Sequence, residues 1–318
     1  MNIICKLFGH KWEYDFPSMP CNRRCYRCKT KERLDVNKSY ETIYSPQIWN
    51  QVEWDNTKKY IHNKKRTMAL NSGVQWTTHT CNFWTGCKKV SQGCAMCYMY
   101  RDKDRYGLDP TKVVQVKQST INKVLKNAVA GDKIFTCSWS DFFIEDADEW
   151  REWAWGIIRD NPQFVWQILT KRPERILQCL PEDWGEGWAH VWIGVSVELQ
   201  KNIDRVPILQ SIPCKTRFIS AEPLLGELDF GETGLYGIHW VIVGGESGND
   251  TGKWGYRPNA IGWMEKIVAQ CKDVNVPVFV KQLGTYLSKK MSLKDRHGGE
   301  IDEFPETLKI RQFPNEEK

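Results

Sequence analysis

Short apolar runs alternate with longer amphipathic segments from about residue 73 to residue 285. The runs are continuous and rich in β-branched and aromatic residues, a pattern typical of parallel strands that are buried on both faces. We expect strands at 74–78, 133–137, 164–169, 190–195, 216–220, 240–243 and 276–280, with an additional short strand at 113–116. Helical spacing occurs between the runs, at 148–159, 173–179, 201–210 and 261–271.

This alternation of strands and helices implies right-handed βαβ crossovers and an α/β fold. We therefore predict a parallel (βα) barrel of TIM type, partial or near-complete, over 73–285. A compact Cys/His-rich stretch at 1–35 predicts a small zinc-binding module of ribbon or knuckle type. Residues 36–72 are polar and basic and are expected to form a linker or arm, and 286–318 a charged, turn-rich C-terminal extension.

The composition is that of a globular protein, with 41% hydrophobic and 26% charged residues among 318. No apolar run approaches the roughly 20 residues that span a bilayer, and the apolar part of the N-terminus is too short for a secretory signal. We expect a cytoplasmic protein without a membrane partner. The net charge of +6 is mild, but two basic clusters stand out: Arg23, Arg24, Arg27, Lys29 and Lys31, and Lys58, Lys59, Lys64, Lys65 and Arg66. They suit phosphate contacts, although such clusters also serve solubility.

Twelve cysteines are unlikely to form disulfides in a reducing compartment, and eight of them fall into two clusters. The central cluster has the spacing C-x6-C-x2-C at Cys87, Cys94 and Cys97, with a glycine before each of the first two. Three thiolates can hold three irons of a 4Fe–4S cluster, which leaves the fourth iron open to S-adenosylmethionine (SAM). The loop follows the first expected strand, and barrel enzymes place their chemistry on such loops.

Two other interpretations of these cysteines remain. A structural zinc ion could use Cys81, Cys87, Cys94 and Cys97, in a non-catalytic protein that binds nucleic acid or protein. Alternatively, the cysteines are simply buried. The iron–sulfur cluster is favoured because the loop opens a βα domain, whereas structural zinc usually stabilises small domains that lack a large core.

Several motifs in this region occur in a specific order. Trp76-Thr77 is followed by TGCKKVSQGCAMCY, SWSDFF (138–143), LTKRPERI (169–176), WIGVSVE (192–198), RFISAEPLLG (217–226), WVIVGGESG (240–248), Tyr256-Arg257-Pro258 and VFVKQLG (278–284). Together they resemble a phage- and prophage-borne family with a three-cysteine motif, which is regarded as radical SAM-like and of unknown substrate. The resemblance implies an enzyme that reductively cleaves SAM to a 5′-deoxyadenosyl radical, with an electron donor such as flavodoxin or ferredoxin. One departure is the first gap of six residues, where radical SAM proteins commonly have three. Cys81 lies outside the matching motif.

Polar residues end several of the expected strands, and in a parallel barrel these ends converge on one mouth. We expect SAM contacts from Ser138, Ser140, Asp141, Lys171, Ser196 and Glu198. Hydroxyls and carboxylates suit the ammonium and ribose of SAM, and a cation suits its carboxylate. Glu222, Glu246 and Lys281 are candidate catalytic residues that face the substrate. Each of these residues alone has an ordinary alternative as a cap or a surface charge.

The N-terminal cysteines predict a zinc site made of Cys5, His10, Cys25 and Cys28. The opening CKLFGHKW also resembles a small phage zinc-binding family. Cys21, Cys25 and Cys28 have the common radical SAM spacing, but no expected strand precedes them and that interpretation leaves Cys5 and His10 unexplained. Whether Cys21 or Cys81 binds metal stays open.

The substrate is the least determined feature of the sequence. The basic module, the basic arm and sixteen tryptophans favour a nucleic acid or nucleotide, because aromatic rings can stack on bases. The alternative is a peptide or protein substrate, with the N-terminal module docking a partner.

Overall fold

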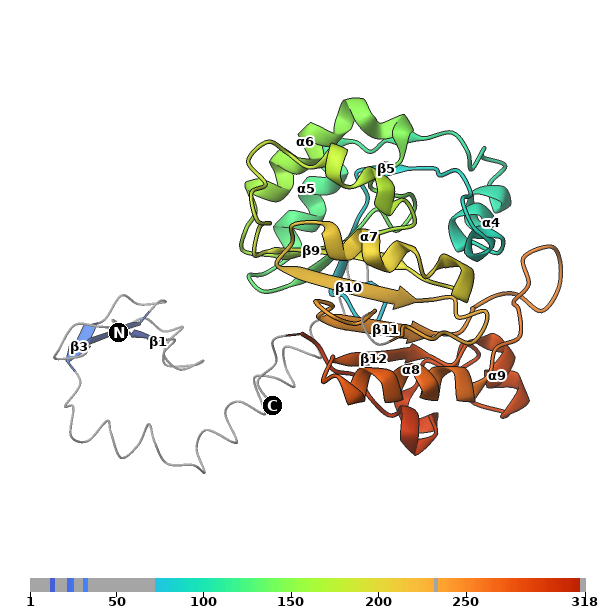
Figure 1. Ribbon diagram of the computed structural model, residues 1–318. Coiled ribbons are helices and arrows are strands. Elements are labelled where there is room, and N and C mark those ends of the chain that lie inside the picture. Colours follow the sequence, from blue (N-terminus) through green and yellow to red (C-terminus); the bar gives the residue numbers. More distant parts are fainter. Residues whose placement is uncertain (1–11, 15–21, 26–30, 34–71, 232–233, 315–318) are drawn as a thin grey trace. The chain divides into compact units, whose positions relative to one another are not determined.

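The computed structural model describes residues 72–231 and 234–314, together with the backbone of three short strands at 12–14, 22–25 and 31–33. The chain divides into two compact units, Met1–Ala69 and Leu70–Lys318 (Figure 1).

The described part of the first unit is an antiparallel sheet in the order β1-β2-β3, with β1 at Trp12–Tyr14, β2 at Asn22–Cys25 and β3 at Lys31–Arg33. Trp12 pairs with Cys25, the last residue of β2. The other predicted zinc ligands, Cys5, His10 and Cys28, lie outside the described residues, as does all of the expected linker at 36–72 except Ser72.

The second unit contains a seven-stranded parallel sheet whose order is β12-β11-β10-β9-β8-β7-β4. Its strands are β4 (His79–Cys81), β7 (Lys133–Thr136), β8 (Val165–Thr170), β9 (Val191–Ser196), β10 (Thr216–Ala221), β11 (Trp240–Gly244) and β12 (Val278–Gln282). Each strand neighbours the next in this series, so the sheet winds in one direction and curls into a half-barrel with β4 and β12 at its edges. The predicted α/β fold with a partial parallel barrel is confirmed.

Helices pack on the convex face of this sheet (Figure 1). They are α5 (Gln118–Asn127), α6 (Asp148–Arg159), α7 (Arg205–Ser211) and α8 (Ile261–Asp273). Their apolar stripes and the outward side chains of the strands form the larger hydrophobic core, to which Ile121, Trp155, Leu209 and Ile267 contribute. Two further helices, α4 (Tyr98–Arg105) and α9 (Thr285–Lys290), follow the ends of the cysteine motif and of β12.

The concave face has its own aromatic core: Trp76, Phe135, Trp192, Phe218, Trp240, Ile242 and Phe279. Phe313, from the C-terminal extension, packs against it. Trp76 is nearly fully buried, with its ring centroid 4.7 Å from that of Phe135. These rings fill one end of the half-barrel and leave the carboxyl ends of the strands for the site.

Several boundaries differ from the predictions. The apolar run at 74–78 is not the first strand, because Val74 and Trp76 pack into the concave core and β4 begins only at His79. The strand expected at 113–116 is β6 (Val114–Gln115), which pairs with β5 (Trp84–Thr85) away from the main sheet. Residues 173–179 form two 3-10 turns, η3 (Pro173–Arg175) and η4 (Leu177–Cys179), instead of one helix. The expected helix at 201–210 is a turn, η5 (Gln200–Asn202), followed by α7.

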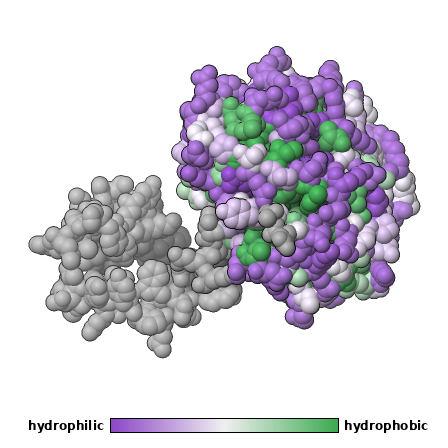
Figure 2. Space-filling model, viewed as in Figure 1, coloured by the Kyte–Doolittle hydropathy of each residue, from purple (hydrophilic) through white to green (hydrophobic). Residues whose placement is uncertain are grey.

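On the face in Figure 2, hydrophobic residues gather near the centre of the larger unit and hydrophilic residues surround them. No helix in the described ranges combines the length and the apolar character needed to cross a membrane.

Candidate functional site

A cavity of about 220 Å³ lies at the carboxyl ends of the parallel strands. Cys87, Cys94 and Cys97 line it together with most of the predicted strand-end residues: Ser138, Ser140, Asp141, Lys171, Ser196, Glu222, Glu246 and Lys281. Glu198 is not part of the lining. Trp76, Phe135 and Leu169 contribute apolar surface. The fold therefore brings residues from eight segments of the sequence to one place, as the barrel prediction requires.

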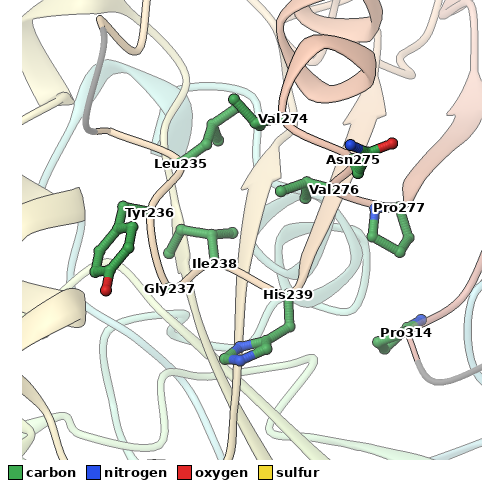
Figure 3. Close-up of a pocket in the computed structure, with 10 residues that line it drawn as sticks. All are labelled: Leu235, Tyr236, Gly237, Ile238, His239, Val274, Asn275, Val276, Pro277 and Pro314. Atoms are coloured by element: carbon green, nitrogen blue, oxygen red, sulfur yellow. The ribbon is translucent and has the colours of Figure 1, made fainter.

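A larger cavity, of about 400 Å³, lies at the opposite end of β11 and β12 (Figure 3). Its side chains are mainly apolar, and Tyr236 and His239 are the two titratable residues among those that line it in the described part of the chain. Volume alone therefore does not identify the site, and the chemistry is concentrated at the carboxyl ends of the strands.

The cysteine loop is held in place by its backbone. Gly86 has a φ of +99°, and a side chain there would overlap the carbonyl of Lys112. The Cys87 N–H donates to the carbonyl of Pro110 (2.9 Å). Gln92–Cys94 form a short 3-10 turn, and Cys97 is the N-cap residue of α4. The glycine before Cys87 is thus required by backbone conformation.

The thiols have cationic neighbours. Nη1 of Arg172, a buried residue, lies 3.9 Å from Sγ of Cys87. Burial raises the pKa of the Cys87 thiol to about 12, with a further increase from Asp141 that Arg172 opposes. Burial also raises the pKa of Cys97, while the N–H groups of Met99 and Tyr100 at the start of α4 lower it. The helix N-terminus and the fixed positive charge thus lower the pKa values of these thiols in part, but burial outweighs them and both pKa values stay above the ordinary value.

Lys171 is the second cation beside the cysteines. Its Nζ donates to Oγ of Ser196 (2.9 Å) and lies 3.4 Å from Oε1 of Glu198. Burial opposes its charged form, but Glu198, Cys94 and Cys97 outweigh burial and raise the pKa of Lys171. The lysine therefore stays protonated.

Asp141 connects the ends of β7 and β8. Its Oδ1 accepts from Oγ1 of Thr170 (2.7 Å), its Oδ2 accepts from the backbone N–H of Lys171 (3.0 Å), and Nη1 of Arg172 lies 3.4 Å away. Both oxygens have protein partners, so Asp141 holds the backbone of Lys171 and the guanidinium of Arg172 in place.

Glu198 lies behind the cysteine loop and is fully buried. It accepts from Oγ of Ser91 in that loop (3.1 Å) and from Nη1 of Arg205 in α7 (2.9 Å). A Cβ on Gly93 would overlap the Glu198 carboxylate, so glycine is needed for this contact. The carboxylate anchors the loop to the barrel, a role that the sequence did not reveal.

Two of the three predicted serines hold segments next to the cavity in place. Oγ of Ser140 donates to the carbonyl of Gly86, and Oγ of Ser138 exchanges hydrogen bonds with the side chain of Asn82. Ser140 therefore contributes to the shape of the cavity wall.

The three candidate catalytic residues lie on the other side of the cavity. Glu222, after β10, pairs with Lys281 of β12. Oε2 of Glu246, after β11, accepts from Nε of Arg257 (2.9 Å), and Nη1 of Arg257 donates to the carbonyl of Gln92 (2.8 Å). The Glu246–Arg257 pair therefore links the loop after β11 to the cysteine loop.

Among the described residues, no group of three or more His, Cys, Asp or Glu side chains lies close enough together to hold a single metal ion. A four-iron cluster binds each cysteine through a different iron, which requires sulfurs that share a cavity without meeting at one point. Cys87, Cys94 and Cys97 share a cavity, whereas Cys81 is buried in the convex core, so the three-cysteine set fits such a cluster.

The fold and site together define a class: a singly wound parallel half-barrel with a three-cysteine cavity at the carboxyl ends of its strands. Residues 71–307 match the family described as "Protein of unknown function (DUF5131)", and the chain belongs to that family. Searches of curated proteins and of solved structures each found no match.

Proposed function

We propose that this protein is a radical SAM enzyme that holds a 4Fe–4S cluster on Cys87, Cys94 and Cys97. The observation that carries the proposal is the cavity where these three thiols lie next to Lys171 and Arg172, at the carboxyl ends of a parallel half-barrel. A cluster held by these residues would, when reduced, supply the single electron needed for the reductive cleavage of SAM to methionine and a 5′-deoxyadenosyl radical.

The chain's own residues would prepare this site. Lys171 and Arg172 offset the negative charge of the three thiolates. The Glu222–Lys281 pair presents a carboxylate and an ammonium to the cavity, groups that suit the ammonium and carboxylate of SAM or a polar substrate. The aromatic core beneath the cavity keeps water from that side of a reactive intermediate.

The proposal extends to partners. Reduction requires a one-electron donor such as flavodoxin or ferredoxin. Cys5, His10, Cys25 and Cys28 would hold zinc in the N-terminal module, whose neighbouring arginines suit contact with nucleic acid. A nucleic acid or nucleotide is the substrate class we favour.

The test is SAM cleavage. The full chain, reconstituted with iron and sulfide under anaerobic conditions and reduced with dithionite, should form 5′-deoxyadenosine from SAM. Cys94→Ala should abolish that product because the cluster loses one of three ligands. Cys179→Ala is the matched control, because Cys179 is a free cysteine outside the cavity, and it should retain the product.

An intact cluster that never yields 5′-deoxyadenosine, in the presence or absence of candidate substrates, contradicts the proposal.

A further inference from the structure

A second polar cavity, of about 420 Å³, adjoins the site. It is formed by α4, the loop after β11 and the segment after α9. Its lining residues are Arg101, Asp102, Asp104, Arg105, Asn249, Trp254, Arg296 and His297. Arg101 lies one helical turn after the predicted cluster ligand Cys97, whose carbonyl accepts from the Arg101 N–H (3.1 Å). The two cavities therefore share α4 and the loop that carries Glu246.

Positive charge dominates the second cavity. Asp104 is committed to Nζ of Lys253 (2.8 Å) and to Nε1 of Trp254 (2.9 Å), and Asp102 lies 3.2 Å from Nε of Arg101. Within the described ranges, no ion pair involves Arg105 or Arg296. Arg296 donates to the carbonyl of Gly248 (3.0 Å) and lies near Asp250, whose pKa Lys289 and Arg296 both lower. Arg105 therefore carries the guanidinium with the least compensation from carboxylates in this part of the structure.

The pKa of His297 responds to the same positive charge. Burial lowers its pKa, and Arg296, Arg101 and Lys281 lower it further against the opposing effect of Asp295. Lys281 belongs to the central cavity, so His297 lies between the two sites. At neutral pH the ring is uncharged, and its Nδ1 pairs with Oγ1 of Thr285 (3.2 Å).

Trp254 adds an aromatic surface. The hydrogen bond to Asp104 fixes its partly exposed ring, and Nζ of Lys89, from the cysteine loop, lies 5.6 Å from the ring centroid. A fixed indole beside guanidinium groups is the combination that binds a base and its phosphate.

We propose that this cavity binds the phosphate ester of a nucleotide or nucleic acid through Arg101, Arg105 and Arg296. The attached nucleoside then extends toward the central cavity. Phosphate binding needs no cluster, but the identification of this ligand as the substrate rests on the proposed function.

The experiment measures binding to the full chain with two probes: a fluorescently labelled single-stranded oligonucleotide and a nucleoside monophosphate. Arg101→Gln/Arg105→Gln should weaken both by about tenfold or more, because two charge-assisted contacts are lost. For the oligonucleotide, the slope of log K against log salt concentration should also become less steep by about 1.4. Each phosphate contact to a single strand contributes about 0.7 to this slope, and the variant loses two contacts.

Lys123→Gln/Lys126→Gln on α5 is the matched control, since it removes the same charge from exposed positions outside the cavity. It should leave binding within about twofold of wild type, and melting temperatures should confirm that both variants fold. If wild-type protein binds the oligonucleotide more tightly than the nucleoside monophosphate, with a steeper dependence on salt, the phosphate belongs to a nucleic acid. If it binds the two probes equally well, the phosphate belongs to a free nucleotide.

The proposal is overturned if neither probe binds, or if the arginine and lysine variants behave alike. Iron content measured in the same samples separates the two claims. If the arginine variant loses phosphate binding but keeps its full iron content, the result supports this cavity. If the reconstituted wild-type protein binds phosphate but holds no iron, the missing iron contradicts the proposed function and leaves the phosphate site supported.

Discussion

Glu198 shows how individual charged residues hold the site together. Its carboxylate is fully buried and contacts Ser91, Lys171 and Arg205, from three different segments. A buried charge is tolerated only when it is paired and hydrogen-bonded, and these contacts meet that requirement. The residue therefore links the cysteine loop, the β8 cation and α7.

Glu198→Gln should lower the free energy of unfolding by about 3 kcal/mol or more, because it leaves the buried Arg205 without its partner. The measurement is the urea midpoint of the larger unit, followed by tryptophan fluorescence. Glu149→Gln, at an exposed position of α6, should change the midpoint very little. Equal midpoints for the two variants would show that Glu198 does not stabilise the fold.

Sequence reasoning located these residues but not their partners. Asp141 and Glu198 were predicted to contact SAM because each follows a strand. In the structure their oxygens accept hydrogen bonds from Thr170, Lys171, Ser91 and Arg205. Ser91 and Glu198 are 107 positions apart, and no local pattern indicates a contact over that distance.

Among the elements, the cysteine loop depends most closely on glycine. Gly93 sits where any side chain would meet the Glu198 carboxylate, and Gly86 adopts a backbone conformation that favours glycine. The loop between β5 and α4 can therefore lie against the barrel only with these two residues in place.

Gly93→Ala should displace the loop from Glu198 and lower cluster retention after reconstitution several-fold, since Cys94 is the adjacent residue. Gly156→Ala is the control, because Gly156 lies in α6 with open space around it and alanine favours a helix. Iron per chain and melting temperature are the measurements. Full iron retention in Gly93→Ala would contradict the requirement for close packing.

The elements themselves were largely predictable. Six of the expected strands overlap β7 to β12, and the helix expected at 148–159 has the bounds of α6, because buried parallel strands and amphipathic helices have strong periodic patterns. The first strand was misplaced because Trp76 packs as a core residue before β4. Helix α4 was missed because its sequence, YMYRDKDR, is charged and begins at a metal-ligand motif.

At the scale of the whole molecule, every candidate residue from Cys87 to Lys281 belongs to the larger unit, which contains the parallel sheet. All three cysteines of the proposed cluster lie in that unit, whereas the predicted zinc ligands belong to the unit at Met1–Ala69. The two metal proposals can thus be tested independently within one preparation.

The central claim is the cluster, and metal analysis of anaerobically purified full-length protein tests it most directly. We predict about four iron and about four sulfide per chain, as a 4Fe–4S cluster requires. Replacement of Cys87, Cys94 and Cys97 together by alanine should remove both, and zinc on the N-terminal module should remain. Zinc on both cysteine groups, with neither iron nor sulfide, would contradict the account.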